Sequence, residues 1–343
     1  MTDIYSMNLA EIEYICEKSG QPRYRAKQIF SWVLKSVSFP EMSNLPSTLK
    51  EYLASQNHTN LPSIVDRRTS KLDGTVKYLW ALFDGNYIES ALMDYDYGKT
   101  VCISTQAGCK MGCLFCASTG LGFARNLLAS EMLAQVAVTS RVEQALVKNV
   151  VLMGVGEPLD NLENVIRFLE LLSHSDGFNI GLRHITLSTC GAKGKIRELA
   201  RHKLQITLSV SLHAPDDDTR NKIMPVNKSN GVLDLMNDCR YYYEVTGRRV
   251  SFEYALMEGI NDAAVHAERL VRLLRTCPGH VNLITFNRVP ESSIVPSSRE
   301  STRRFRDILL KNGINVTVRR RLGTDIAAAC GQLRRGILRR VNV

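Results

Sequence analysis

The sequence has no apolar run long enough to span a lipid bilayer. The longest runs, near Val151 and Leu208, fall short of the roughly 20 residues that a membrane helix needs. The N-terminal stretch MTDIYSMNLAEIEY lacks the basic-then-apolar pattern of a signal peptide. Internal repeats and low-complexity segments are also missing. We therefore expect a globular protein that makes no membrane contact and is cytoplasmic by default.

Acidic residues are scarcer than basic ones, which gives a formal net charge of +10 over 343 residues. A polyanion such as RNA is the natural partner for such a chain. A solvated basic surface would give the same composition, so charge alone leaves both interpretations open. The basic residues crowd two places, Arg23, Arg25, Lys27 and Lys35 near the N-terminus and Arg319, Arg320, Arg321, Arg334, Arg335, Arg339 and Arg340 near the C-terminus.

Nine cysteines, an odd number, argue against a secreted disulfide framework. Three of them, Cys109, Cys113 and Cys116, follow a C-x3-C-x2-C spacing in a glycine-punctuated stretch. A structural zinc site would want four ligands, and no second close Cys/His pair follows. A cubane iron–sulfur cluster on three thiolates leaves one iron open to a substrate or cofactor. Ordinary buried cysteines are the alternative, but this spacing favours the cluster.

The first part of the chain reads as three short helices, over residues 8–20, 21–37 and 45–55. Asn8 is a plausible N-cap of the first helix, and Gly20 ends it. Residues 62–99 are richer in β-formers, with Asp73-Gly74 and Asp84-Gly85 as hairpin-turn dipeptides. The predicted divisions are a helical accessory, RNA-binding domain (1–60), an antiparallel β unit or linker (61–99), a main domain (100–320) and a basic C-terminal segment (321–343).

From Thr100 onward, strand and helix patterns alternate. Such alternation predicts an α/β fold with a parallel sheet and helical crossovers. About six repeats are too few for a closed eight-fold barrel, so an open, partial (β/α)6 barrel is expected. The strand candidates are TVCIST, VKNVVLM, RHITLST, LQITLSVSL, RVSFEYAL, VNLITF and INVTVR.

Polar and glycine residues gather where these predicted strands end. In β/α folds the active site lies at the carboxyl ends of the strands. Any one of these residues could be incidental, and His213 alone could be a structural histidine; their shared placement is what makes them candidates. The residues are Gly154, Gly156, Glu157, Ser188, Ser211, His213 and Asn287.

Several stretches together resemble the radical S-adenosylmethionine (SAM) adenine-C2 methyltransferase family that acts on 23S rRNA and tRNA. The resemblance covers nearly the whole chain. It is carried by YRAKQIFSWV, CISTQAGCKMGCLFCASTGLGFARNL, VLMGVGEPLDN, RHITLSTCG, SLHAPDDDTRNKIMPVN, NLITFN and DIAAACGQL.

The resemblance implies roles for individual residues. Cys330 would accept a methyl group, Cys102 would be a second redox-active cysteine, and Glu89 would be the proton acceptor, with an exposed strand glutamate as the alternative. Val155 and Cys190 depart from the residues usual in the family, and Cys190 has no assigned role. Cys109, Cys113 and Cys116 would hold one [4Fe–4S] cluster, and Gly156, Glu157, Ser188, Ser211, Leu212, His213 and Asn287 would line the SAM pocket.

The resemblance also implies a mechanism that consumes two SAM molecules per methylation. One SAM would methylate the Cys330 thiolate, and a second, on the open iron, would give the radical that activates this methyl group. The methylene carbon would add to adenine, Glu89 would remove the ring proton, and Cys102 would release the product as a Cys102–Cys330 disulfide. An external donor such as flavodoxin or ferredoxin would supply electrons.

Two alternatives to carbon-2 methylation stay open. A sister enzyme that confers antibiotic resistance methylates carbon 8 of the same adenine and shares the cysteines, although ASTGLGFARNL and the N-terminal helices favour the carbon-2 enzyme. A non-catalytic iron–sulfur RNA-binding protein is the other alternative. The presence of Cys102 and Cys330 argues against it.

Overall fold

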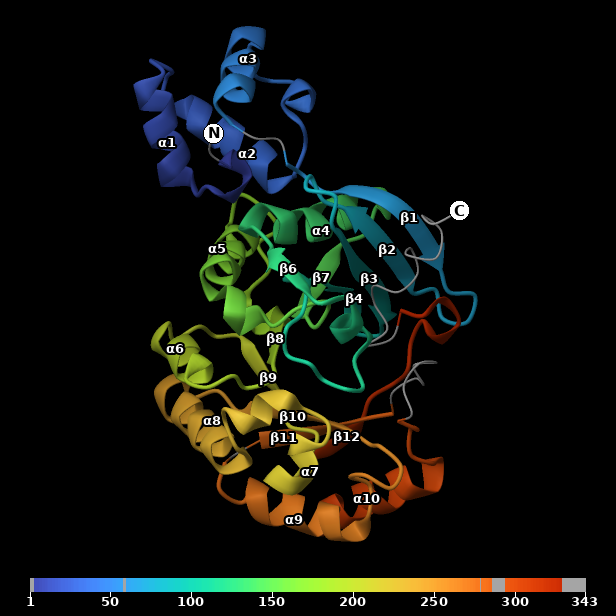
Figure 1. The fold of residues 1–343 in the computed structure, drawn as a ribbon. Helices are drawn as coiled ribbons and strands as arrows, with labels where there is room; N and C mark the ends of the chain where they lie inside the picture. Colours follow the sequence, from blue (N-terminus) through green and yellow to red (C-terminus); the bar gives the residue numbers. More distant parts are fainter. Residues whose placement is uncertain (1–2, 58–59, 278, 286–293, 329–343) are drawn as a thin grey trace.

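The computed structural model describes residues 3–57, 60–277, 279–285 and 294–328 (Figure 1). Asn287, Cys330 and the basic residues from Arg334 onward therefore lie outside the described residues. Within the described ranges, no helix combines the length and the apolar character that crossing a membrane requires.

The three predicted N-terminal helices are present as α1 (Leu9–Lys18), α2 (Tyr24–Leu34) and α3 (Ser47–Gln56). Asn8 caps α1 in a capping box with Glu11, as its sequence position predicts. The helices bury their own apolar stripe, including Ile12, Ile29 and Phe30. They sit at one end of the molecule, beside α4 and α5 (Figure 1).

The segment after the N-terminal helices forms the antiparallel edge of the main sheet. It contains β1 (Ser63–Thr69), β2 (Val76–Ala81) and β3 (Tyr87–Tyr95), and β3 pairs antiparallel with β4 (Gly98–Cys102). The two Asp-Gly dipeptides make the predicted turns, because Gly74 and Gly85 adopt φ of +73° and +80°. The hairpin unit is therefore hydrogen-bonded into the same sheet as the main domain.

The main domain confirms the predicted α/β architecture with an open, partial barrel. Its parallel strands follow one another in chain order, so that each crossover returns the chain to the next position in the sheet. The strands after β4 are β7 (Val147–Leu152), β8 (Ile185–Thr189), β9 (Thr207–Ser211), β10 (Val250–Ala255), β11 (Gly279–Ile284) and β12 (Val316–Val318). The main helices are α4 (Ala129–Val142), α5 (Leu162–Ser173), α6 (Lys195–Arg201), α8 (Val232–Thr246), α9 (Ala264–Leu274) and α10 (Arg299–Lys311).

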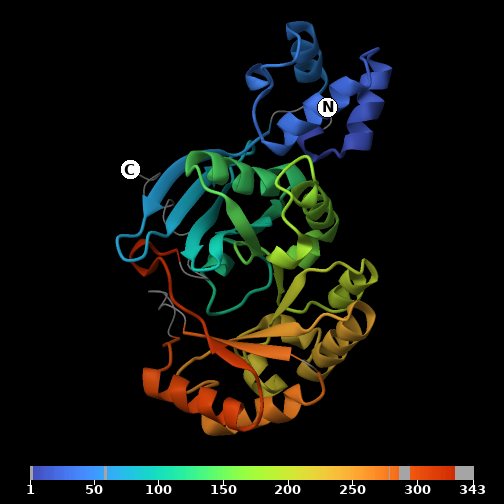
Figure 2. The ribbon, with the colours of Figure 1, turned by 180° about the vertical axis from the view of Figure 1, so that it is seen from behind.

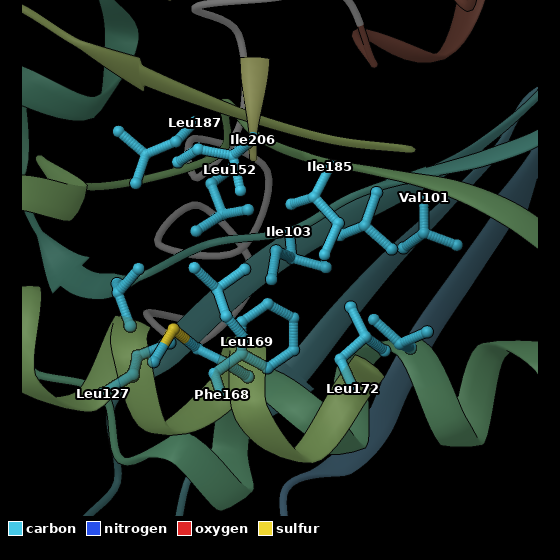
Figure 3. Close-up of a cluster of buried hydrophobic side chains, with 14 of the residues drawn as sticks. Val101, Ile103, Leu127, Leu152, Phe168, Leu169, Leu172, Ile185, Leu187 and Ile206 are labelled. Carbon is cyan, nitrogen blue, oxygen red and sulfur yellow. The ribbon is translucent and has the colours of Figure 1, made fainter. Parts of the chain in front are cut away.

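Helices cover the outer face of this curved sheet, as the two opposite views show (Figures 1 and 2). Figure 3 shows part of the resulting core, where Phe168, Leu169 and Leu172 of α5 face Leu152 of β7 and Ile103, which follows β4. Burial of each large apolar side chain contributes about 1.5–3 kcal/mol. Because strand side chains alternate between faces, the remaining strand residues point to the inner face of the sheet. The functional residues were predicted at the carboxyl ends of these strands.

Candidate active site

A pocket lies on the inner face of the sheet, at the carboxyl ends of the parallel strands. Nine of the residues predicted from the sequence line it together. They come from the cysteine loop and from the ends of β7, β8 and β9, which are distant in sequence. These residues are Cys109, Cys113, Cys116, Gly154, Gly156, Glu157, Ser188, Ser211 and His213.

The three clustered cysteines lie on one loop between β5 (Gln106–Gly108) and β6 (Phe123–Asn126). Backbone bonds fold the loop back on itself, since Cys109 N–H donates to Gly122 O over 3.1 Å and Cys116 N–H to Cys113 O over 3.1 Å. Gly112 permits the turn with φ of +75°, and an added Cβ there would meet Pro225 at 3.3 Å. The loop thus brings three thiols to one pocket wall.

The donor set of this loop fits an iron–sulfur cluster. Three thiols are the soft ligands that such clusters take. Burial raises the pKa of Cys109 to about 11 and also raises the pKa of Cys113, so metal binding must displace their protons. Among the described residues, no three His, Cys, Asp or Glu side chains could together hold a single metal ion.

The glycines after β7 let two loops approach each other closely. A Cβ at Gly154 would lie 2.6 Å from Ile103 O, and one at Gly156 would lie 2.6 Å from Gln106 Cβ. Glu157, which follows, is buried; its carboxylate accepts hydrogen bonds from the N–H groups of Leu159 (3.1 Å) and Cys190 (2.8 Å). Burial raises the pKa of Glu157.

We expect Gly156→Ala to destabilise the protein by roughly 2–5 kcal/mol, because strain at positive φ (about 1–2) adds to overpacking against Gln106 (about 1–3). Gly194→Ala is a matched control, since Gly194 has φ of +74° but open space around its Cβ position. Gly194→Ala should lower the free energy of unfolding only by the backbone strain at positive φ. Urea unfolding of both variants measures the difference in stability. Equal unfolding midpoints would mean that the close contact between Gly156 and Gln106 does not add to the cost.

His213 is held as a neutral hydrogen-bond donor toward the pocket. It adopts φ of +55°, and its Nδ1 accepts the Ala255 N–H over 2.9 Å. Burial, helped by the Arg220 charge, lowers the pKa of His213 to about 3. The ring is therefore uncharged at neutral pH, with its proton on Nε2.

A buried arginine beneath the pocket was not predicted. The Arg220 side chain is fully buried and donates to the carbonyl oxygens of Leu212 (3.0 Å), Cys190 (2.7 Å) and Ser211 (3.0 Å) and to Asn227 Oδ1 (2.9 Å). All four of these acceptors are neutral oxygens. The guanidinium stays protonated because its intrinsic pKa is so high.

Glu253 and Arg319 form a second unpredicted group in the pocket. Glu253 Oε1 accepts from Ser209 Oγ (2.6 Å) and Asn282 Nδ2 (2.9 Å), while Arg319 lies 3.9 Å from Oε2 and 3.4 Å from Met153 Sδ. Arg319 was interpreted as part of an RNA-facing arginine run, but it lines this pocket instead. A charged residue inside a strand was the only sequence signal for Glu253.

The remaining predicted residues lie beside the pocket or outside the described residues. Glu89 and Cys102 are buried on adjacent strands β3 and β4, and Cys102 packs with Ala91, Met93 and Leu322. Leu212 belongs to the outer core rather than the pocket lining. No disulfide joins any two of the eight described cysteines. Asn287 and Cys330, and with Cys330 the implied Cys102–Cys330 disulfide, lie outside the described residues.

Comparisons with known proteins agree with this geometry. Residues 103–271 match the radical SAM superfamily, and residues 2–58 match a ribosomal RNA large subunit methyltransferase N-terminal domain. A probable dual-specificity RNA methyltransferase RlmN of Clostridium novyi is 45% identical over 99% of both chains, and one of Lachnoclostridium phytofermentans is 49% identical over 97% of this chain and 94% of its own.

A solved structure extends the likeness to three dimensions. The crystal structure of a radical SAM methyltransferase from Sphaerobacter thermophilus matches with a TM-score of 0.93 and 43% identity, over 97% of this chain and 99% of that one. Identity at this level along the full length leaves one assignment: the chain belongs to the dual-specificity RNA methyltransferase RlmN family of radical SAM enzymes.

Proposed function

We propose that this protein methylates carbon 2 of an adenine in 23S rRNA and in tRNA by radical SAM chemistry. The observation that carries the proposal is the meeting of nine predicted residues in one pocket of a chain whose relatives are RNA methyltransferases along its full length. The N-terminal match to a ribosomal RNA methyltransferase domain favours rRNA as one substrate.

Different residues of the pocket would bind the two cofactors. Cys109, Cys113 and Cys116 would hold a [4Fe–4S] cluster, and the β7–β9 strand ends would bind SAM. When bound, the pair supplies a 5′-deoxyadenosyl radical, chemistry that no side chain can provide. His213 offers a neutral donor and Glu157 a buried carboxylate, so the protein itself orients the cofactor and excludes water.

Glu89 and Cys102 are proposed as the residues that act on the RNA adduct. Glu89 is buried, which favours a functional carboxylate over the exposed strand glutamate that the sequence left open. Cys102 lies on the adjacent strand and packs against Leu322. The chain then leads through buried Ala328 toward Cys330, the proposed methyl carrier.

RNA would approach the pocket across the basic face of the N-terminal helices. Lys27 of α2 and Lys35, which follows its last residue, are exposed, and Lys35 Nζ lies 4.6 Å from the Trp32 ring centroid. Such side chains suit phosphate contacts, which position RNA without reading its sequence. The target adenine would have to leave its stack to enter the pocket. An external electron donor of the flavodoxin or ferredoxin class and a cytoplasmic location complete the proposal.

Mass spectrometry of adenines from treated rRNA and tRNA tests the proposal directly. With reconstituted cluster, SAM and reductant, we expect 2-methyladenine in both RNAs. The appearance of 8-methyladenine would favour the sister activity. Release of no 5′-deoxyadenosine at all would instead favour the non-catalytic iron–sulfur RNA-binding protein.

A further inference from the structure

A buried ion pair joins the two central strands of the antiparallel edge. Lys77 Nζ of β2 lies 2.9 Å from Glu89 Oε1 of β3, with side chains only 8% and 3% exposed. In the register, Leu79 stands opposite Glu89 and Lys77 opposite Ala91. The lysine therefore reaches its partner diagonally across the inner face, within range for a long side chain.

The Lys77–Glu89 ion pair lies next to apolar side chains, which is an unfavourable place for two charges. The adjacent inner-face residues Ala91, Met93, Cys102 and Leu322 form an apolar cluster. Two charges in such a place lose their hydration, and apolar residues of similar volume often serve stability as well or better. Stability alone is thus a poor reason for the pair, whereas a carboxylate that must be ionised in a buried place needs a fixed opposite charge beside it.

Lys77 also binds the segment that leads toward Cys330. Its Nζ donates to Ala327 O over 3.2 Å, three residues before that cysteine. The same segment is held at two further points of the β1–β2 turn. Asp325 accepts from Ser70 Oγ (2.7 Å) and from Lys71 N–H (2.9 Å), and Gly323 N–H donates to Asp73 (2.8 Å). Lys77 is therefore the link between Glu89 and this docked segment.

We propose that Lys77 is a positioning residue for the methylation, which keeps Glu89 ionised and joins it to the docked Gly323–Ala327 segment. The inference rests on the proposed function, in which Glu89 accepts the ring proton. The step that Lys77 serves moves one proton from carbon 2 of the adduct to the Glu89 carboxylate and changes no oxidation state. The pair passes from neutral to a single positive charge, which the Ala327 carbonyl helps to hold.

The test uses the full-length reconstituted enzyme with SAM, reductant and labelled rRNA in a single turnover. In Lys77→Met, 2-methyladenine should fall about 10²-fold, the usual loss when a general base is disabled. Release of 5′-deoxyadenosine should stay within about twofold, and a protein–RNA species should persist on a denaturing gel because its ring proton is not removed. Lys77→Arg keeps the charge and should restore product to within about tenfold.

Two further variants separate the possible outcomes. Lys99→Met removes the lysine of an exposed pair with Asp94 on neighbouring strands and should behave as wild type. Glu89→Gln should reproduce the persistent species. If Glu89→Gln methylates normally, the base assigned in the proposed function is wrong. If Glu89→Gln stalls while Lys77→Met methylates normally, or if both Lys77 variants lose 5′-deoxyadenosine release together, the positioning role is overturned.

Discussion

Cys102→Ala should trap a covalent protein–RNA species, while Cys330→Ala should trap none and make no methylated RNA. If Cys330 carries the methyl group as proposed, its removal leaves no carrier, so no bond to the base can form. Without Cys102 the carrier is still loaded and still reacts, but no thiol remains to break the sulfur bridge to RNA. The burial of Cys102 against Leu322, within the segment that leads to Cys330, supports this pairing of roles.

Denaturing gels with labelled RNA measure the trapped species, which should survive denaturant because a thioether link holds it. Cys239→Ala, which removes a buried cysteine of α8, is the matched control and should methylate normally. If Cys102 and Cys330 were purely structural, both variants would be destabilised and would lose activity alike, without a crosslink. A Cys102→Ala enzyme that releases 5′-deoxyadenosine without any crosslink would refute the assigned roles.

Cys113→Ala should lose its iron almost completely. Wild-type protein reconstituted without oxygen should hold about four irons per chain, as a cubane does, and should be brown. Removal of one of only three thiolate ligands leaves two, too few to retain the cluster. Iron analysis and the visible absorption band measure the loss. Cys16→Ala, in α1 of the N-terminal helices, should keep full iron content, and equal iron in both variants would rule out the cysteine loop as the site.

The sequence was sufficient to predict the parts of the site that depend on local spacing. Cys109, Cys113 and Cys116 converge because they share one short loop. Ser188 and Ser211 converge because carboxyl ends of parallel strands meet at one edge of a sheet. Neither result needs knowledge of distant contacts, which explains why residue patterns alone reached them.

The sequence did not predict the roles of Lys77, Arg220 or Glu253, because these roles depend on which surfaces are buried in the fold. In VKYLWALF, Lys77 is the one charged residue of an otherwise apolar stretch, and a lysine in such a strand usually faces solvent. Here the sheet face opposite the helices is itself enclosed, so the lysine on that face is buried. Strand register decides this, and register is a long-range property that a short stretch does not encode.

The docking of Gly323–Ala327 against the β1–β2 turn has a consequence for how the protein is made. Strands of the main sheet are neighbours in chain order, so most of the fold can form progressively as the ribosome releases the chain from its N-terminus. The hydrogen bond from Gly323 to Asp73 spans 250 residues and forms only when this order is nearly complete. The Gly323–Ala327 segment is therefore docked last, after the pocket at the strand ends has been built.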